Sequence, residues 1–399
     1  MTLNVLLAGG GTGGHIFPLL SVAEALRAEV PDVDVTFVGT ARGMESTLLP
    51  ARGEKLELLD ALPLKGGSLR DTARGLAKAV TGIPSARSLV RRLAPDVCLS
   101  TGGYAAGTVS LAARTLGVPV ALLEPNAVLG LANRLLSPAV SRAYVVFPET
   151  ATRFRPSVVR QLGMPIRTVF QPVPYTPSQD SPRLVILGGS QGAQHLNQNL
   201  PAAIAPLFEK IPGLRVLHQA GKNKDDEVRA KYASLAATHL AQIEVVPFVD
   251  DVASTLASAD LVVARAGAGS VAEICTVGRA ALFVPFPYAA EDHQRHNAES
   301  LEKVGAAVCL PQAKATVERL SSELGGLLSD PARRASLASA AKDRGSAGSS
   351  RAIALDLLEL VEATKRTPLL AVGLFDQHEH LLIQRNQRSV RAPELSMLD

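Results

Sequence analysis

The chain has 399 residues, 47% of them hydrophobic and 20% charged, which is enough apolar material for two globular domains and excludes a disordered protein by composition. Aromatic residues contribute only 4% and Trp is absent, which argues against proteins that stack bases or sugar chains on aromatic rings, so we expect no nucleic-acid partner. The net charge of +4 still indicates an anionic partner.

The first half of the chain alternates short apolar runs with helical patterns, as in a parallel sheet with helical crossovers. We expect strands at 4–8, 33–38, 97–100, 118–123 and 143–147, and helices at 17–28 and 104–116. No basic segment precedes the first run, so it is predicted to be a strand and not a signal peptide. No apolar stretch reaches the roughly 18 residues that span a bilayer, so we expect a soluble or peripheral protein.

Repeated prolines at 163–178 predict a linker, after which the alternation restarts. Strands are expected at 183–187, 214–219, 243–246, 261–264, 281–284 and 306–310, and a helix at 193–210. The sequence therefore predicts an α/β protein with two doubly wound, Rossmann-like parallel-sheet domains, at 1–162 and 163–340. A helix at 341–364 is expected to pack back on the first domain, and a tail at 365–399 to be disordered.

Three glycine-rich turns each follow a predicted strand and lead into a helix: residues 9–15, 188–193 and 265–273. Glycines let the backbone approach a ligand, and a helix N-terminus offers unpaired N–H groups to an anion. One such turn is weak evidence, because it can be a purely structural turn and its spacing matches neither the dinucleotide nor the P-loop pattern. Because ligands bind at the carboxyl ends of strands in open α/β sheets, three such turns predict a crevice for a nucleotide diphosphate and an acceptor.

Four motifs in this order resemble the MurG-type N-acetylglucosaminyltransferases of bacterial peptidoglycan synthesis. They are Gly10-Gly11-Thr12-Gly13-Gly14-His15, Gly188-Gly189-Ser190-Gln191-Gly192-Ala193, Ala266-Gly267-Ala268-Gly269-Ser270-Val271-Ala272-Glu273 and Asp292-His293-Gln294-Arg295-His296-Asn297-Ala298. The resemblance covers about residues 1 to 360 and implies a GT-B fold with a central cleft. It implies inverting transfer of N-acetylglucosamine from UDP-N-acetylglucosamine to the 4-hydroxyl of undecaprenyl-pyrophosphoryl-N-acetylmuramyl pentapeptide, which converts lipid I to lipid II.

By this resemblance the donor lies mostly on the second domain. Ser190 and Arg167 would hold the diphosphate, whose charge grows as UDP leaves. Glu273 would accept the ribose hydroxyls, although a glutamate early in a helix is also favoured by the helix dipole alone. The other donor-binding residues implied are Val249 for the uracil, Gln294 for the sugar, and Ala268, Gly269, Ser270, Val271 and Ala272.

The first domain would complete the site with Thr12, Gly13, Gly14 and Asn126. The family has His-Glu-Gln-Asn where this chain has Leu123-Glu124-Pro125-Asn126, so no role for the missing His or Gln carries over. One general base must take the proton of the acceptor hydroxyl, and both His15 and Glu124 are candidates. No Asp-x-Asp pair lies at a strand end, and Asp250-Asp251 is predicted to begin a helix, so neither a metal nor another cofactor is required.

The lipid acceptor implies a surface for the anionic inner membrane, on its cytoplasmic face. Residues 62–92 carry seven basic side chains and one acidic one among apolar residues, which is typical of a headgroup-binding segment. A solvated helix face is the alternative. Three other functions stay open: a different GT-B transferase, a UDP-sugar epimerase, and a non-catalytic UDP-sugar-binding protein.

Overall fold

The computed structural model describes residues 2–59, 81–189 and 191–366 of the chain. Two parallel sheets dominate this part, and every strand pair in both is parallel. The predicted α/β architecture of two doubly wound domains is therefore confirmed. Among these residues no helix is long and apolar enough to cross a membrane.

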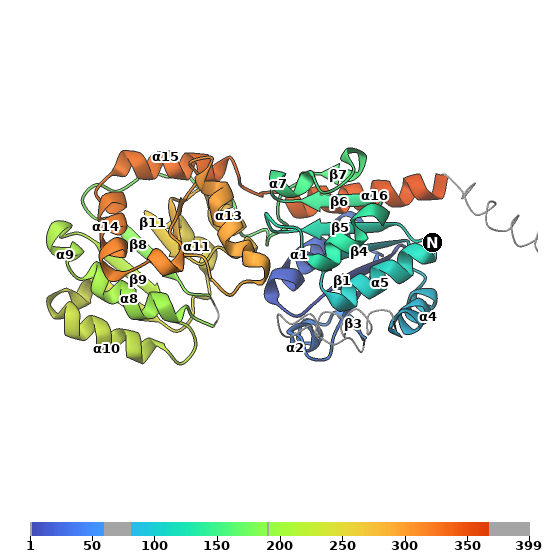
Figure 1. Cartoon of the computed structure of the whole chain (residues 1–399), viewed down its shortest axis with the longest axis horizontal. Coiled ribbons are helices and arrows are strands. Elements are labelled where there is room, and N and C mark those ends of the chain that lie inside the picture. Colours follow the sequence, from blue (N-terminus) through green and yellow to red (C-terminus); the bar gives the residue numbers. More distant parts are fainter. Residues whose placement is uncertain (1, 60–80, 190, 367–399) are drawn as a thin grey trace, which may run out of the picture. The chain divides into compact units, whose positions relative to one another are not determined.

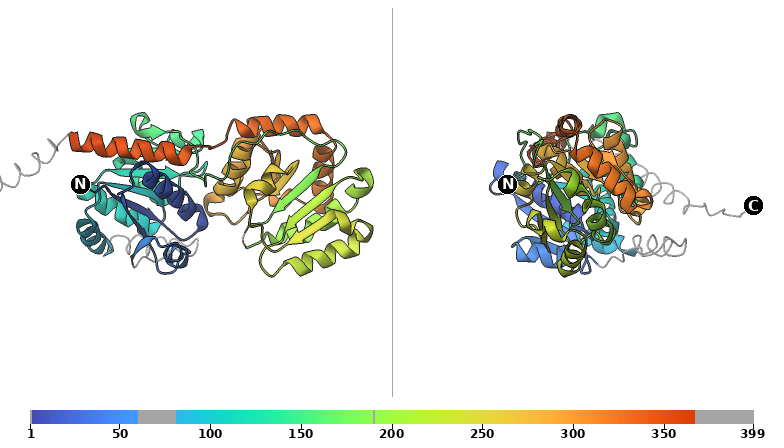
Figure 2. Two further views of the ribbon diagram at one scale, coloured as in Figure 1. Left: turned by 180° about the vertical axis from the view of Figure 1, so that it is seen from behind. Right: turned by 90° about the vertical axis from the view of Figure 1, so that its left-hand side faces the viewer.

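The first sheet has seven strands in the order β3-β2-β1-β4-β5-β6-β7. Its strands are β1 Asn4–Gly9, β2 Asp34–Gly39, β3 Lys55–Leu58, β4 Val97–Gly102, β5 Val120–Glu124, β6 Arg142–Val145 and β7 Val159–Arg160. Its helices are α1 Gly13–Glu29, α2 Glu45–Ala51, α4 Ile83–Leu93, α5 Tyr104–Thr115, α6 Leu131–Leu136 and α7 Pro148–Ala151. Figure 1 shows α5 in front of this sheet, and the reverse view in Figure 2 shows α1 in front, so the two helices cover opposite faces.

The second sheet has six strands in the order β10-β9-β8-β11-β12-β13. Its strands are β8 Arg183–Leu187, β9 Arg215–Gln219, β10 Ile243–Val246, β11 Leu261–Ala264, β12 Ala281–Phe283 and β13 Val308–Cys309. The helices of this half are α8 Gln194–Ile204, α9 Leu207–Lys210, α10 Asp225–Leu235, α11 Val252–Ala257, α12 Ala268–Val277, α13 His293–Glu302, α14 Val317–Leu328 and α15 Pro331–Lys342, and α16 Ser349–Arg366 follows. The central strands are apolar because helices cover both sheet faces, as in β11, where all four residues are buried.

The structure departs from the expected elements at four places. The continuous helix expected at 193–210 is wrong: α8 ends at Ile204 and α9 begins at Leu207, because Pro206 between them has no N–H to continue the helix. Helix α1 begins at Gly13, so Pro18 lies inside the helix and not in its first turn. Strands β3 and β7 were not expected, since one is partly exposed and the other has only two residues.

The segments around the predicted domain boundaries contain little regular structure. No helix or strand occupies residues 161–182. The last helix begins at Ser349 and not near 341, directly after Gly348, whose φ of +79° does not fit a helix. The boundaries at 162 and 340 stay predictions, and the tail from 367 onward lies outside the described residues.

Helix α16 is tied to the first sheet through the carboxylate of Asp356. One oxygen accepts hydrogen bonds from Tyr144 Oη at 2.8 Å and Arg142 Nε at 3.1 Å, and the other accepts from Arg160 Nε at 3.1 Å. Arg142 and Asp356 are largely buried, with 16% and 12% of their side chains exposed. This three-donor carboxylate joins α16 to β6 and β7.

We expect Asp356→Ala to lower the free energy of unfolding by about 2–3 kcal/mol, because it leaves two half-buried guanidinium groups without their anion. Urea denaturation monitored by circular dichroism measures this change. Glu359→Ala, which removes an exposed carboxylate from the same helix, is the control and should change stability by less than about 0.5 kcal/mol. Equal effects of the two variants would show that the carboxylate does not hold α16 in place.

Candidate active site

The glycine-rich turns lie where the strand order of each sheet reverses. In the first sheet the chain runs from β1 outward to β2 and β3, then returns to β4 on the other side of β1. In the second sheet β8 and β11 are the corresponding neighbours. The turn at 9–12 follows β1, the turn at 188–193 follows β8, and the turn at 265–267 follows β11 (Figure 1). Open α/β sheets bind ligands at such switch points, so the predicted placement of all three turns is confirmed.

The helices that follow these turns begin without a side-chain cap. Thr12, Ala193 and Gly267 are the N-cap residues of α1, α8 and α12, and none of them accepts a hydrogen bond from its helix through a side chain. Asp251, Thr316 and Asp330 cap α11, α14 and α15 through their side-chain oxygens, whereas α2, α4, α5, α6, α7, α9, α10 and α13 also begin without a side-chain cap. The predicted helix start at Asp251 is thereby confirmed. What distinguishes α1, α8 and α12 is that each follows a glycine-rich turn, so that a ligand can approach first-turn N–H groups that no N-cap side chain of the described residues binds.

Only part of the first turn is open to a ligand. A Cβ atom on Gly9 or Gly13 would collide with neighbouring side chains, whereas one on Gly11 would meet nothing within 4 Å, and one on Gly14 only the Thr12 hydroxyl at 3.7 Å. Thr12 and Gly14 are exposed and Gly13 is half-buried. The part of this turn with open space beside it is therefore Gly11, Thr12 and Gly14.

His15 lies in the first turn of α1 and is held by its own loop. Its Nδ1 lies 3.0 Å from the carbonyl oxygen of Gly10. A carbonyl only accepts, so we assign the proton to Nδ1, which leaves the lone pair of Nε2 unprotonated. Burial lowers the pKa of His15 below its usual value, so the neutral imidazole persists at neutral pH. This tautomer suits a general base acting through Nε2.

Glu124 is the other candidate base, and its carboxylate is already occupied. One oxygen accepts from the backbone N–H of Asn126 at 3.1 Å and its Nδ2 at 3.3 Å. The other accepts from Gly130 N at 3.1 Å and Asn133 Nδ2 at 3.0 Å. Burial raises the pKa of Glu124, against the effect of these hydrogen bonds. The geometry favours a structural role for Glu124 in shaping residues 125–130, and the identity of the base stays a prediction.

Asn126, predicted to bind sugar, also has both side-chain atoms engaged. Its Oδ1 accepts a hydrogen bond from Asn297 Nδ2 at 3.1 Å. Asn297 lies in α13, is fully buried, and also accepts from Ala127 N at 2.8 Å. Each of the two Asn126 atoms keeps a further hydrogen-bonding position, because an amide oxygen accepts two bonds and an amide nitrogen donates two, so the partly exposed Asn126 can bind a sugar hydroxyl as well. Asn297 is three residues after Gln294 and was not among the predicted site residues.

Gln294 lies in the first turn of α13 with its amide half satisfied. Its Oε1 accepts from Phe286 N at 3.0 Å, and its amide nitrogen has no partner in the described part of the chain. Glu291 and Asp292, just before the helix, both have φ of +52°, a conformation that costs energy for residues other than glycine. Strained backbone thus positions an amide that can donate to a ligand.

Glu273 and Arg167, two of the predicted donor-binding residues, form an ion pair. Arg167 Nη2 lies 3.8 Å from Glu273 Oε1, and 25% of the Glu273 side chain is exposed. No group within 2–59, 81–189 or 191–366 donates a hydrogen bond to this carboxylate. Burial raises the pKa of Glu273 to about 7, although Arg167 favours the ionised form. A buried carboxylate with free acceptor sites fits a ligand that brings hydroxyl donors.

The other residues predicted to bind the donor substrate lie in α12, in the loop after β10 and in the turn after β8. In α12, Ala268, Val271 and Ala272 are buried whereas Gly269 and Ser270 are partly exposed. A Cβ atom at Gly269 would meet nothing within 4 Å, so a ligand has room there. Val249 is buried in the loop between β10 and α11. Ser190 lies outside the described residues, between Gly189 with its φ of +75° and Gln191.

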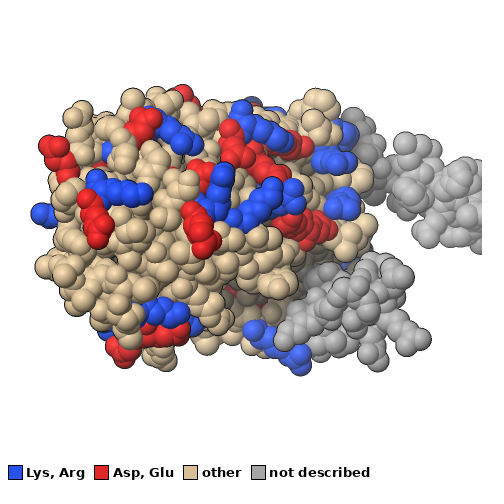
Figure 3. Space-filling view, turned by 60° about the vertical axis from the view of Figure 1, so that its left-hand side comes forward, with Lys and Arg blue, Asp and Glu red and all other residues tan. Residues whose placement is uncertain are grey.

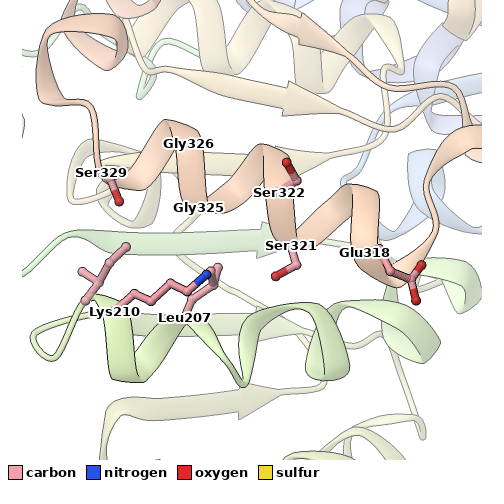
Figure 4. A pocket seen from close by; sticks show the side chains of 9 residues that line it. Leu207, Lys210, Glu318, Ser321, Ser322, Gly325, Gly326 and Ser329 are labelled. Carbon is pink, nitrogen blue, oxygen red and sulfur yellow. The ribbon is translucent and has the colours of Figure 1, made fainter.

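An alternative site would be marked by a pocket, by surface charges of one sign or by possible metal ligands. A pocket of about 600 Å³ between α9 and α14 contains no predicted site residue; its lining is Leu207, Lys210, Ile211, Glu318, Ser321, Ser322, Gly325, Gly326 and Ser329 (Figure 4). Figure 3 shows basic and acidic side chains interspersed on the displayed face, without a field of one sign. Within the described ranges, no cluster of three or more His, Cys, Asp or Glu residues could hold a metal ion.

Sequence reasoning missed Glu45, which lies at the first position of α2 and is completely buried. It accepts hydrogen bonds from Gly11 N and Thr40 N, both at 2.9 Å. Gly11 is 34 residues away in the chain, so no local pattern predicts this contact. A lone acidic residue before an apolar helix was the only available signal.

Comparison with known proteins gives consistent matches over both domains. The model of the glycosyltransferase family 28 N-terminal domain matches residues 5–145, and that of the glycosyltransferase family 28 C-terminal domain matches residues 183–353. A relative from Sorangium cellulosum is 52% identical over 92% of this chain and 91% of its own length. A relative from Anaeromyxobacter dehalogenans (strain 2CP-C) is 39% identical over 92% of this chain and 95% of its own length. Both are named UDP-N-acetylglucosamine--N-acetylmuramyl-(pentapeptide) pyrophosphoryl-undecaprenol N-acetylglucosamine transferase.

Solved structures agree with the sequence matches. The crystal structure of Acinetobacter baumannii MurG is similar with a TM-score of 0.75 and 32% identity, and covers 90% of this chain and 99% of that one. A UDP-GlcNAc 2-epimerase from Neisseria meningitidis, bound to UDP-GlcNAc, is similar with a TM-score of 0.62 over 90% of this chain and 100% of that one. Its identity is only 14%, so this likeness shows a shared fold alone.

The raised pKa of Glu273 predicts a pH-dependent stability cost. Its folded-state pKa of about 7 exceeds the ordinary value of 4.5, so the folded protein holds a proton that the unfolded chain releases between about pH 4.5 and 7. The free energy of unfolding therefore falls as the pH rises through this window. We expect Glu273→Gln to be more stable than the parent at pH 8, by at most about 3 kcal/mol, with a difference that shrinks toward pH 5.

Chemical denaturation at pH 5 and pH 8 measures this difference. Glu244→Gln, which changes an exposed glutamate of the same domain, serves as the control and should show no such dependence on pH. A Glu273→Gln effect of the same size at both pH values would contradict the assignment.

Proposed function

The chain belongs to glycosyltransferase family 28, and on that premise we propose that it transfers N-acetylglucosamine from UDP-N-acetylglucosamine to N-acetylmuramyl-(pentapeptide) pyrophosphoryl-undecaprenol, the reaction for which its 52%-identical relative is named. The observation that carries the proposal is the pair of glycine-rich turns, each at the switch point of its own sheet and each followed by an uncapped helix. The choice of a transferase is supported by the two family models and by the 52%-identical relative, which match both domains.

The second domain supplies the donor site in this proposal. The free N–H groups at the start of α8 and α12, with Ser190, hold the diphosphate, and Arg167 stabilises the charge that grows as UDP leaves. Glu273 accepts both ribose hydroxyls, which supply the donors that its carboxylate lacks. Val249 lies against the uracil, and the free amide nitrogen of Gln294 donates to the sugar.

The first domain supplies the acceptor site and the base. His15 Nε2 removes the proton from the 4-hydroxyl of the muramyl sugar as that oxygen attacks the anomeric carbon from the face opposite the diphosphate. The bond between the anomeric carbon and the UDP oxygen breaks as the new glycosidic bond forms, so configuration inverts. The proton stays on His15 and the charge leaves with UDP. Glu124 keeps Asn126 in place through the hydrogen bonds described above.

A lipid-linked acceptor requires a membrane surface, and we place the protein peripherally on the cytoplasmic face of the cell membrane. Most of the basic segment 62–92 lies outside the described residues. Its described end is α4, where Ala86, Leu89 and Val90 are buried in the first domain and Arg92 pairs with Glu57 at 2.9 Å. The end of the segment is thus an ordinary amphipathic helix, and the membrane contact rests on the basic residues before it.

The proposed function is tested by incubating the protein with labelled UDP-N-acetylglucosamine and the lipid-linked acceptor. We expect label in the lipid fraction and release of UDP only when the acceptor is present. Retention of all label in the sugar nucleotide contradicts the proposal. Acceptor-independent change of the sugar nucleotide would identify an epimerase, and tight binding without turnover a binding protein.

Glu273→Ala tests the donor site separately. The variant loses two hydrogen bonds to a charged acceptor, so the KM for the sugar nucleotide should rise on the order of 10- to 100-fold while kcat falls less. Steady-state kinetics with the donor varied gives both constants. Glu244→Ala is the matched control on the surface, and a parental donor KM in Glu273→Ala would remove Glu273 from the site.

The membrane proposal predicts weaker binding to anionic vesicles in low salt when Ser replaces Arg70, Arg74 and Lys78 together. Each basic residue contributes roughly 1 kcal/mol near such a surface, so the partition coefficient should fall by up to about 100-fold. Vesicle sedimentation measures it. A variant with Lys210, Lys222 and Lys303→Ser removes the same charge elsewhere, and equal losses in both variants would show a nonspecific effect of net charge.

A further inference from the structure

Glu45 occupies a space left by Gly10, after β1, and by Gly39 and Gly43, at the end of β2 and in the loop that leads to α2. A Cβ atom added to Gly10, Gly39 or Gly43 would collide with the Glu45 side chain, and the glutamate itself is completely buried. Both carboxylate oxygens accept hydrogen bonds: Oε2 from Gly11 N at 2.9 Å, and Oε1 from Thr40 N at 2.9 Å and Thr40 Oγ1 at 3.0 Å. The glycine at position 10 is thus explained by a carboxylate and not by a ligand.

The same peptide group that binds Glu45 also binds His15. The N–H of Gly11 and the carbonyl of Gly10 belong to one planar peptide unit. Its N–H donates to Glu45 Oε2 at 2.9 Å, and its carbonyl oxygen accepts from His15 Nδ1 at 3.0 Å. The carboxylate, the peptide and the imidazole therefore form one hydrogen-bonded chain, in which each bond polarises the next.

We propose that Glu45 is a positioning residue that acts on His15 through the Gly10–Gly11 peptide, holding the imidazole in the tautomer whose Nε2 takes the acceptor proton. The proposal rests on the proposed function, because it assigns the base role to His15. The carboxylate fixes the peptide plane, the peptide carbonyl fixes the Nδ1 proton, and the negative charge stabilises the imidazolium that forms when Nε2 is protonated. In Ser-His-Asp triads, the aspartate orients its histidine and stabilises the imidazolium in the same way, but by a direct hydrogen bond.

The charges that act on His15 come from two elements. Burial has the largest effect and lowers the pKa of His15, and the hydrogen bond to Gly10 raises it; of the two charges, His293 at the start of α13 lowers this pKa and Glu45 in α2 raises it. His293 directs its own Nδ1 toward Ala290 O at 2.8 Å. Within the described part of the chain, Glu45 is the anion that opposes burial and His293.

Glu45→Gln is the central variant, because it keeps the shape and removes the charge. Gln presents only one acceptor oxygen, so it cannot bind both Gly11 N–H and the two Thr40 donors. We expect kcat to fall roughly 10- to 100-fold, less than the roughly 10²- to 10⁴-fold expected for His15→Ala, with the donor KM unchanged. Thr40→Val is the matched control: it removes one hydrogen bond to Glu45 but leaves the bond to Gly11, so kcat should stay within about twofold.

A double-mutant cycle separates positioning from folding. If Glu45 acts through His15, the double variant Glu45→Gln/His15→Ala should be no slower than His15→Ala. The proposal would be overturned if the double variant lost kcat by the product of the two single-variant losses. It would also be overturned if Glu45→Gln raised the donor KM and left kcat unchanged. Glu45→Asp retains the anion on a shorter side chain and should restore part of kcat. If Glu45→Gln does not fold, the cycle is run with Glu45→Asp and read in the same way.

An NMR titration of the His15 imidazole tests the relay without any substrate. The His15 signal is assigned by its loss in His15→Ala. We expect its titration midpoint to move to lower pH in Glu45→Gln and to stay near the parental value in Thr40→Val. An unchanged midpoint in an active transferase overturns the relay and leaves the proposed function standing. A shifted midpoint without transfer to the lipid acceptor supports the relay and overturns the proposed function.

Discussion

Helices that begin without a side-chain cap, directly after a buried parallel strand, are the constraint on which the rest of this molecule depends. The first-turn N–H groups of α1, α8 and α12 have no side chain to accept their hydrogen bonds, whereas α11, α14 and α15 use Asp or Thr for this purpose. Unsatisfied donors at a helix start cost free energy unless water or an anion binds them. The fold places such helix starts at the switch points of both sheets, which is where open α/β sheets bind anionic ligands.

Two buried carboxylates show how surroundings assign different tasks to the same side chain. Glu124 accepts hydrogen bonds from four donors of its own domain and organises the loop that follows β5. Among the described residues, Glu273 has one partner, the guanidinium of Arg167 at 3.8 Å. The hydrogen-bonding positions of the first carboxylate are filled, whereas those of the second are left open. Burial raises the pKa of both, so the pKa direction alone does not distinguish them, whereas the hydrogen bonds do.

Sequence reasoning correctly predicted the parts of the site that depend only on residues adjacent in the chain. A strand, a glycine run and a helix start are adjacent in the chain, so the turns after β1, β8 and β11 were placed correctly. Pro206, which interrupts the expected helix 193–210, was visible but outweighed by good helix formers. Glu45 and Asn297 could not be found in this way, because their partners Gly11 and Ala127 lie 34 and 170 residues away. The roles of single site residues remain predictions for the same reason: they depend on groups that only the fold brings together.

The cavity around the Glu45 carboxylate has a consequence for how this domain can change over generations. Gly10 follows β1, and Gly39 and Gly43 lie at the end of β2 and in the loop after it, yet each leaves room for the same side chain. Larger residues at these positions become possible only after the glutamate has been shortened, and shortening it first opens a void between them. Either first substitution, a larger residue at a glycine or a shorter one at position 45, is therefore expected to destabilise the domain. The four positions therefore constrain one another, and a substitution at one of them is tolerated only together with a second.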